Sequence, residues 1–243
     1  NPARRSSHLP GAELAWCPGA PGHTGEAHGV AEAAGAHYGS GAMSPAFWAP
    51  VSLRKRADGS TAVFPHFVMD RAKPGMLTVN QAGQRFVNES TSYHLFGLAM
   101  QKQQADGSRA VPAYLVCDAE ALRKYGIGMV RPGGKGLAPF LADGYLTQAD
   151  TLGALATALG IQPAALQSTV ERFNQLAGSG TDTDFQRGVT AYQRNIGDPA
   201  WNGSNPCLGP LAQAPFYAVR LYPGDIGAAM GFATDGNASA LDA

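Results

Sequence analysis

Glycine and proline interrupt this chain so often that most of its secondary-structure elements must be short. The sequence has 31 glycines and 17 prolines among 243 residues, and only 15% of its residues are charged. Because glycine favours turns and proline ends helices, this composition favours many short elements joined by irregular segments over a helical bundle. Hydrophobic residues make up 44% of the chain, which is enough for a substantial core.

The clearest helical signal is a pair of helices between residues 150 and 177. Asp150 is expected to cap the first helix, whose leucine and alanine side chains fall on one face, and Gly160 ends it. Pro163 stands in the first turn of the second helix, where proline is well tolerated. The apolar face of the second helix carries Leu166, Val170, Phe173 and Ala177.

Short apolar and β-branched runs predict strands between the other helices. These runs lie at residues 62–68, 76–80, 84–88, 112–117 and 216–222. The turn at residues 80–83 predicts that its two flanking strands pair as a hairpin. Further helices are expected at 24–37, at 93–103 and at 119–125, with Thr24 and Asp118 as caps and a glycine-rich turn system from residue 223. The mixed order predicts an α+β fold, a small antiparallel sheet with packed helices.

Charge and cysteine content exclude several classes of partner and site. The 18 basic and 18 acidic residues cancel, so nothing favours a nucleic acid or an anionic membrane surface as partner. No apolar run approaches the roughly 20 residues that span a bilayer, and the amino terminus lacks the apolar region of a signal peptide. Cys17, Cys117 and Cys207 lie too far apart for a zinc motif or a disulfide framework, which favours a reducing, cytoplasmic setting.

The common catalytic and cofactor motifs are absent from the sequence. It has no G-x-G-x-x-G after a strand, no P-loop, no H-E-x-x-H and no G-x-S-x-G. The six histidines are scattered, so no metal site is predicted. Asp182 and Asp184 lack the rest of a calcium-binding loop, which favours a capped loop at this position.

Six stretches, in order, resemble the FAD-dependent 3-ketosteroid delta-1-dehydrogenase family, part of the wider fumarate reductase and succinate dehydrogenase flavoprotein group. Together they cover nearly the whole chain. They are GAPGHTGEAHGVAEAAGA (19–36), PGMLTVNQAGQRFVNESTSY (74–93), GYLTQADTLGALATALGI (144–161), LQSTVERFNQLAGSGTDTDFQRG (166–188), GDPAWNGSNPCLGPL (197–211) and APFYAVRLYPGDIG (214–227).

The resemblance implies that the chain is a fragment centred on a catalytic cap domain. In that family the cap is inserted into a discontinuous FAD-binding domain. Residues 1–54 would then end the first FAD-domain segment, 55–223 would form the cap, and 224–243 would begin the returning segment. The dinucleotide fingerprint would precede the chain. FAD is therefore the expected cofactor of the full-length enzyme, whereas the fragment alone is expected not to retain it.

The same resemblance points to Tyr93 as the catalytic base. In the family a tyrosine that follows an N-E-x-x-P-Y stretch takes a proton next to a ketone, and FAD accepts a hydride from the neighbouring carbon. Here the stretch is Asn88-Glu89-Ser90-Thr91-Ser92-Tyr93, with Ser92 in place of the proline. A phenol has a pKa of about 10 in water, so it needs help to act as a base. The start of a helix supplies part of it, roughly 0.3–1 kcal/mol in favour of a negative charge.

Tyr93 also distinguishes the chain from fumarate reductases, which carry an arginine at this position, four residues after the glutamate. No cluster of arginine and histidine nearby would bind two carboxylates. The substrate is therefore expected to be a hydrophobic small-molecule ketone, with an external electron acceptor. A fumarate-reductase-like flavoprotein with another substrate, or an inactive folding module, stays as the alternative.

Five residues resemble flavin-proximal positions of the family. Gly224, Asp225 and Gly227 match a P-G-D-L-G loop, and Thr24 and Gly25 match the start of a T-G-D-G stretch. The sequence departs from the family at Glu26, which replaces the aspartate of T-G-D-G. It also has Ala-Ala-Met-Gly at 228–231, where the family has T-K-G-G.

Overall fold

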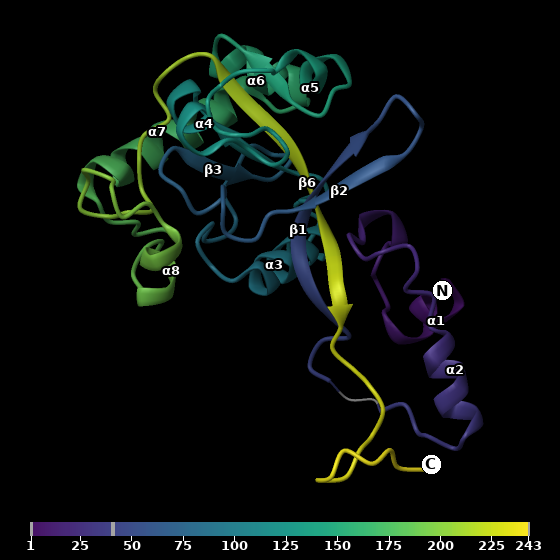
Figure 1. The fold of residues 1–243 in the computed structure, drawn as a ribbon. Coiled ribbons are helices and arrows are strands. Elements are labelled where there is room, and N and C mark those ends of the chain that lie inside the picture. The colour runs from purple at the N-terminus through teal and green to yellow at the C-terminus, as the bar shows by residue number, and fades with distance from the viewer. Residues whose placement is uncertain (1, 40–41, 243) are drawn as a thin grey trace.

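The computed structural model describes residues 2–39 and 42–242, which fold into short helices around one six-stranded antiparallel sheet (Figure 1). The helices are α1 (Pro2–His8), α2 (Glu26–Ala33), α3 (Tyr93–Ala105), α4 (Ala119–Tyr125), α5 (Ala138–Ala142), α6 (Leu152–Leu159), α7 (Pro163–Ser179) and α8 (Ala191–Ile196), with a 3₁₀ turn at Leu14–Trp16. The strands are β1 (Ala46–Lys55), β2 (Thr61–Pro65), β3 (Met76–Val79), β4 (Ala113–Cys117), β5 (Thr147–Ala149) and β6 (Phe216–Ala228). The predicted α+β class is confirmed.

The long strand β6 joins two parts of the sheet. The strand order is β2-β1-β6-β4-β3, and β5 also pairs with β6. The first half of β6 pairs with β4 and β5, and the second half pairs with β1. Residues 113–117 align with 217–221, whereas residues 46–51 align with 222–228. One strand therefore connects the helix-covered end of the molecule to the end where α1 and α2 lie (Figure 1).

Alternation along β3, β4 and the first half of β6 gives this part of the sheet two buried faces. On β4, Leu115 and Cys117 enter the core formed with α3 and α4, whereas Tyr114 and Val116 enter the core formed with α6 and α7. The same alternation holds on β3 and on the first half of β6. Because both faces are buried, these strands appear in the sequence as continuous apolar runs.

Several predicted elements are confirmed with their end signals. Helices α6 and α7 form the expected pair, with Gly160 in the left-handed conformation after α6 and Pro163 opening α7. Helix α4 follows Asp118, whose carboxylate accepts a hydrogen bond from Ala121 N, and Gly126 ends it.

The predicted hairpin at residues 76–88 is wrong. Strand β3 pairs with β4, and residues 84–88 form no strand. The turn at 80–83 is present, since Gly83 N donates to Asn80 O. The Asn80 side chain then accepts from Ala82 N and Gln84 N, so the chain leaves the sheet instead of returning along it.

Two predicted helix caps and one predicted turn also differ from the structure. Thr151, not Asp150, caps α6 by accepting a hydrogen bond from Ala154 N. Gly25, not Thr24, is the residue before α2, and it makes no side-chain cap. The glycine-rich stretch from residue 223 begins as strand, because β6 runs on to Ala228 along β1.

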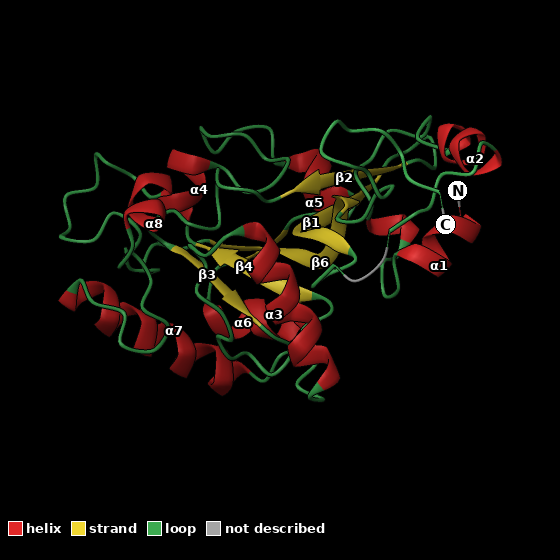
Figure 2. Ribbon diagram, turned by 90° about the horizontal axis from the view of Figure 1, so that it is seen from below, coloured by secondary structure: helices red, strands yellow, loops and turns green. Residues whose placement is uncertain are grey.

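Helices α1 and α2 lie at the end of the molecule where β6 ends, away from α6, α7 and α8 (Figures 1 and 2). Neither helix has a buried residue. The predicted domain boundaries at residues 54/55 and 223/224 fall inside β1 and β6, which pair with each other. Within the described ranges no helix is long and apolar enough to cross a membrane.

Candidate active site

A cavity of about 900 Å³ lies between α1, the segment 17–28 and the end of β6. Four of the five predicted cofactor residues line it: Thr24, Gly25, Asp225 and Gly227. Thr24 and Gly25 are about two hundred residues away from Asp225 and Gly227 in the sequence. The fold therefore brings together positions that only the family resemblance linked. The fifth, Gly224, precedes Asp225 on β6 but does not line the cavity.

Asp225 is held in place by Arg5, which reaches across from α1. The guanidinium donates two hydrogen bonds to the carboxylate, of which the one to Oδ2 measures 2.9 Å. The Asp225 side chain is only 3% exposed and that of Arg5 is 14% exposed, so this ion pair is largely removed from water. The hydrogen bonds to Asp225 raise the pKa of Arg5. The pair therefore fixes one wall of the cavity with its charge nearly neutralised.

Thr24 and Gly25 lie just before α2, on another wall of the cavity. The Thr24 hydroxyl donates to the Glu26 carboxylate, and this hydrogen bond lowers the pKa of Glu26. Gly25 adopts φ +87°, a left-handed conformation that glycine reaches without strain. The capping residue Gly25 offers no side-chain acceptor, and the Glu26 carboxylate accepts from its own backbone N–H at this end of the helix.

Glycine at residue 224 allows two segments to pack closely. A Cβ atom there would lie 2.3 Å from Trp16 O and 2.7 Å from a Val51 methyl group. Any side chain would push β6 away from the 3₁₀ turn and from β1. Gly224 therefore acts through packing, whereas Gly227 lines the cavity.

Tyr93 is the first residue of α3 and does not line the cavity. Ser92 caps the helix by accepting a hydrogen bond from Leu95 N at 3.3 Å. Tyr93 is half-buried, and its ring meets Phe67 edge-on, with ring centroids 5.1 Å apart. The predicted helix start is confirmed, so Tyr93 stands in the first turn, where the helix favours negative charge.

Strand β1 connects Tyr93 to the cavity. Trp48 N donates to Nδ1 of His94, the neighbour of Tyr93, at 3.2 Å. The same Trp48 aligns with Asp225 across the β1–β6 ladder. Phe47, one residue earlier, meets the His94 ring edge-on at 6.2 Å and aligns with Gly227. The start of α3 therefore lies one strand away from the cavity-lining end of β6.

Three large apolar side chains in the segments near Tyr93 are exposed. Phe47 is 51% exposed, Met69 69% and Leu95 55%. Phe47 lies on β1, Met69 in the turn after β2, and Leu95 in the first turn of α3. None of the three lines the cavity, but exposed hydrophobic residues of this size can mark a surface that receives an apolar ligand.

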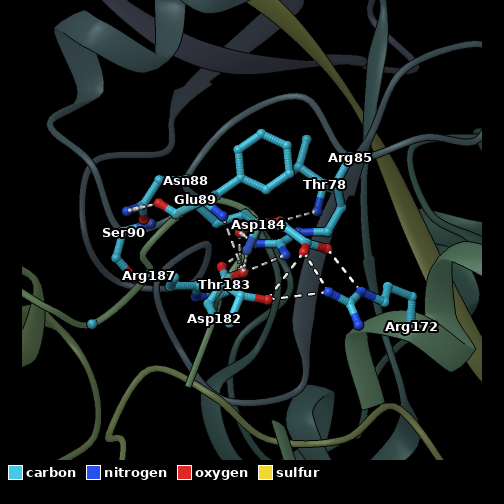
Figure 3. A network of polar contacts seen from close by, with 12 residues as sticks. Thr78, Arg85, Asn88, Glu89, Ser90, Arg172, Asp182, Thr183, Asp184 and Arg187 are labelled. Carbon is cyan, nitrogen blue, oxygen red and sulfur yellow. Dashed lines mark hydrogen bonds and ion pairs between the residues drawn. The ribbon is translucent and has the colours of Figure 1, made fainter. Parts of the chain in front are cut away.

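Sequence reasoning missed a buried network of charges just before Tyr93 (Figure 3). Glu89 is 0% exposed and accepts hydrogen bonds from Arg85 at 3.0 and 2.7 Å. Arg187, also 0% exposed, lies 3.1 Å from the same carboxylate, and Asp182 accepts hydrogen bonds from Arg85 as well. The i,i+4 spacing of Arg85 and Glu89 was the only local signal, and Arg187 comes from about a hundred residues away.

Asp182 and Asp184 form the capped loop that the sequence favours. Asp182 accepts from the backbone N–H groups of Asp184 and Phe185, at 3.1 and 3.2 Å. Asp184 pairs with Arg172 at the surface. In residues 2–39 and 42–242, no three histidine, cysteine, aspartate or glutamate side chains are grouped as a metal site.

The chemistry of the cavity fits part of a flavin dinucleotide. The Thr24 hydroxyl and the Arg5–Asp225 pair are polar groups in its lining, and the absence of a side chain at Gly227 allows a ligand to approach the backbone closely. A pyrophosphate also needs a glycine-rich strand-to-helix turn, and the sequence has none. The residues present therefore fit a part of FAD other than its pyrophosphate.

Comparison with known proteins agrees with this geometry. The profile of the FAD binding domain family matches residues 2–243. The chain therefore belongs to the FAD binding domain family of flavoproteins, and FAD is the cofactor of that family.

Two curated relatives and one crystal structure are similar over most of the chain. The 4-oxocyclohex-2-ene-1-carboxylate 5-dehydrogenase of Sinomonas cyclohexanicum is 37% identical over 88% of the chain, and the 3-oxosteroid 1-dehydrogenase of Mycolicibacterium smegmatis is 37% identical over 93%. The chain spans only 36% and 39% of their lengths. The 3-ketosteroid delta1-dehydrogenase of Sterolibacterium denitrificans, solved with 1,4-androstadiene-3,17-dione, superposes with a TM-score of 0.88 at 35% identity, covering all of this chain and 42% of that one.

Proposed function

We propose that the chain forms the substrate-facing part of an FAD-dependent dehydrogenase that removes hydrogens from two adjacent carbons next to a ketone. The substrate is a hydrophobic cyclic ketone of the 3-ketosteroid kind, and an external acceptor takes the electrons. The names of both curated relatives contain an oxo group and a dehydrogenase activity, which supports this class. In this proposal residues 55–223 are the cap, and residues 1–54 and 224–243 belong to the FAD domain.

The observation that carries the proposal is the position of Tyr93. It begins α3, it is half-buried, and it is joined through His94 and Trp48 to the strand that lines the cavity. A phenol placed there can take a proton from a substrate that rests on the exposed apolar side chains. Bound FAD supplies hydride acceptance from the neighbouring carbon.

The surroundings of Tyr93 favour a neutral substrate over a dicarboxylate. Arg71 contacts the segment before Tyr93, but it is 0% exposed, and its guanidinium donates to the carbonyls of His66 and Glu89. It is therefore not available to a substrate carboxylate. The exposed side chains of Phe47, Met69 and Leu95 offer hydrophobic contact instead.

Steady-state kinetics of full-length wild type and Tyr93→Phe test the proposal, with a 3-ketosteroid and an artificial electron acceptor. The substitution keeps the ring that packs on Phe67 and removes only the hydroxyl. Turnover is expected to fall by roughly 10²–10⁴-fold, as for the loss of a general base. A variant that keeps turnover within a factor of a few would show that Tyr93 is not the base.

A further inference from the structure

Four buried side chains form a continuous hydrogen-bonded network at the turn that follows β2. His66 Nδ1 lies 2.7 Å from Asp70 Oδ2, and His66 Nε2 lies 2.7 Å from Ser52 Oγ. Ser52 Oγ lies 2.7 Å from the Tyr145 hydroxyl. Ser52, His66 and Asp70 are at most 3% exposed, and Tyr145 is 5% exposed. These residues come from β1, from the turn after β2 and from the loop before β5.

Backbone and side-chain donors fix both ends of this hydrogen-bonded network. Asp70 also accepts from Arg71 N at 2.7 Å and Gly128 N at 2.8 Å, so its carboxylate is favoured in the ionised form. A carboxylate only accepts, so His66 donates to it from Nδ1. Ser52 and Tyr145 share a hydrogen bond, and the Tyr145 oxygen also accepts from Met129 N at 2.9 Å.

The order serine, histidine, aspartate is that of a hydrolase triad, but its burial excludes that role. Ser52 is 1% exposed and its oxygen is engaged by Tyr145, so no acyl substrate reaches it. The network packs closely against Gly128, because a Cβ atom at that residue would lie 2.1 Å from the Tyr145 oxygen. A fully satisfied buried network of this kind holds backbone segments in one arrangement.

The segment that it holds contacts both Tyr93 and the residues just before it. The turn 66–71 presents Phe67, whose ring meets the Tyr93 ring at 5.1 Å. Arg71, at the other end of the turn, donates to His66 O at 2.9 Å and to Glu89 O, four residues before Tyr93. The hydrogen-bonded network therefore contacts the turn 66–71, and the turn contacts the start of α3.

We propose that His66 is a positioning residue for Tyr93, acting through Phe67 and Arg71 to fix the phenol in its productive orientation. This inference rests on the proposed function, since it gives Tyr93 the role of base. His66 itself touches no substrate. Its contribution is to hold the turn 66–71 against the start of α3.

A double-mutant cycle on the full-length, flavin-loaded protein tests the inference. His66→Leu removes both hydrogen bonds and should lower kcat by roughly 10- to 100-fold with little change in KM, as expected for a misplaced catalytic group. His66→Asn keeps an N–H near the place of Nδ1 and should recover most of the lost turnover. In a Tyr93→Phe background, His66→Leu should change the residual turnover by no more than about two-fold, because the two residues act through one group.

The outcomes separate the inference from the proposed function. Equal losses in both backgrounds would mean that His66 acts only on general stability, and would overturn the inference. A Tyr93→Phe variant with near-normal turnover would refute the proposed function instead. If His66→Leu does not fold, Ser52→Ala interrupts the same chain one link away, and the same cycle with Tyr93→Phe distinguishes these outcomes.

Discussion

Replacing Glu89 with glutamine should strongly destabilise the protein, although the side chain keeps its shape. The carboxylate accepts from Arg85 at 3.0 and 2.7 Å and from Thr78 N at 3.2 Å, and lies 3.1 Å from Arg187. Glu89→Gln leaves two buried guanidinium groups with Asp182 as the nearest remaining carboxylate of the network. Removing one partner of a buried ion pair costs about 3–5 kcal/mol. For a chain of this size that lowers Tm by roughly 6–20 °C.

The pH dependence of this destabilisation provides a second test. Burial opposes ionisation, but the charges of Arg85 and Arg187 outweigh it, so the pKa of Glu89 is lowered. A carboxyl with a lowered folded pKa contributes its full stability above the unfolded value of about 4.3 and loses it as the pH falls further. The difference in Tm between wild type and Glu89→Gln should therefore be constant near neutral pH and shrink below about pH 4.

Thermal unfolding followed by circular dichroism measures both effects. Asp184→Asn is the matched control, because it makes the same carboxylate-to-amide change in an ion pair whose side chains are 52% and 32% exposed. This surface pair should contribute no more than about 1 kcal/mol. If Glu89→Gln costs as little as Asp184→Asn, the buried network does not stabilise the fold.

Two further outcomes are expected. Gly83→Ala should destabilise the protein by roughly 1–3 kcal/mol in urea unfolding, because φ is +77° and the new Cβ would lie 2.8 Å from an Ile161 methyl group. Gly59→Ala is the control, because Gly59 has φ +81° and open space around it. It measures the cost of the backbone conformation alone and should be less destabilising. The 243-residue chain alone should purify without FAD, because it has no glycine-rich strand-to-helix turn for the pyrophosphate, and a stoichiometric flavin absorbance spectrum would contradict this.

Local signals predicted several helices of this fold well. The pair α6 and α7 carries its own stop and start signals in Gly160 and Pro163, and α4 carries Asp118 and Gly126. Each of these residues acts within one turn of the helix that it ends or begins. Such elements can be predicted from sequence because the interactions that define them are short-range.

Strand pairing could not be predicted in the same way. The turn at Gly83 has the pattern of a hairpin, but the partner of β3 is β4, more than thirty residues away. The extension of β6 was hidden by Pro223 and Gly224. Pro223 aligns with Pro50, and a pair of prolines fits the ladder only where no N–H donor is needed. That register depends on β1, which the local sequence of β6 does not reveal.

The candidate site shows the same division. Only family resemblance linked Thr24 and Gly25 with Asp225 and Gly227, and the fold places all four around one cavity. Arg5, which neutralises Asp225, had no signal in the sequence because its partner lies 220 residues away. Long-range ion pairs of this kind follow from the tertiary fold and not from local pattern.

The pairing of β1 with β6 explains how Tyr93 and the cavity can keep a fixed geometry across a proposed domain boundary. Helix α3 packs directly on β1 at Gly97, where a Cβ would lie 2.6 Å from the Trp48 Cβ. Trp48 aligns with Asp225, so the helix, the strand and the cavity wall are in successive contact. Two hydrogen-bonded strands that cross together resist bending more than two separate loops would. We therefore expect the distance between the candidate base and the flavin side to be set by the sheet itself, with little dependence on loop closure.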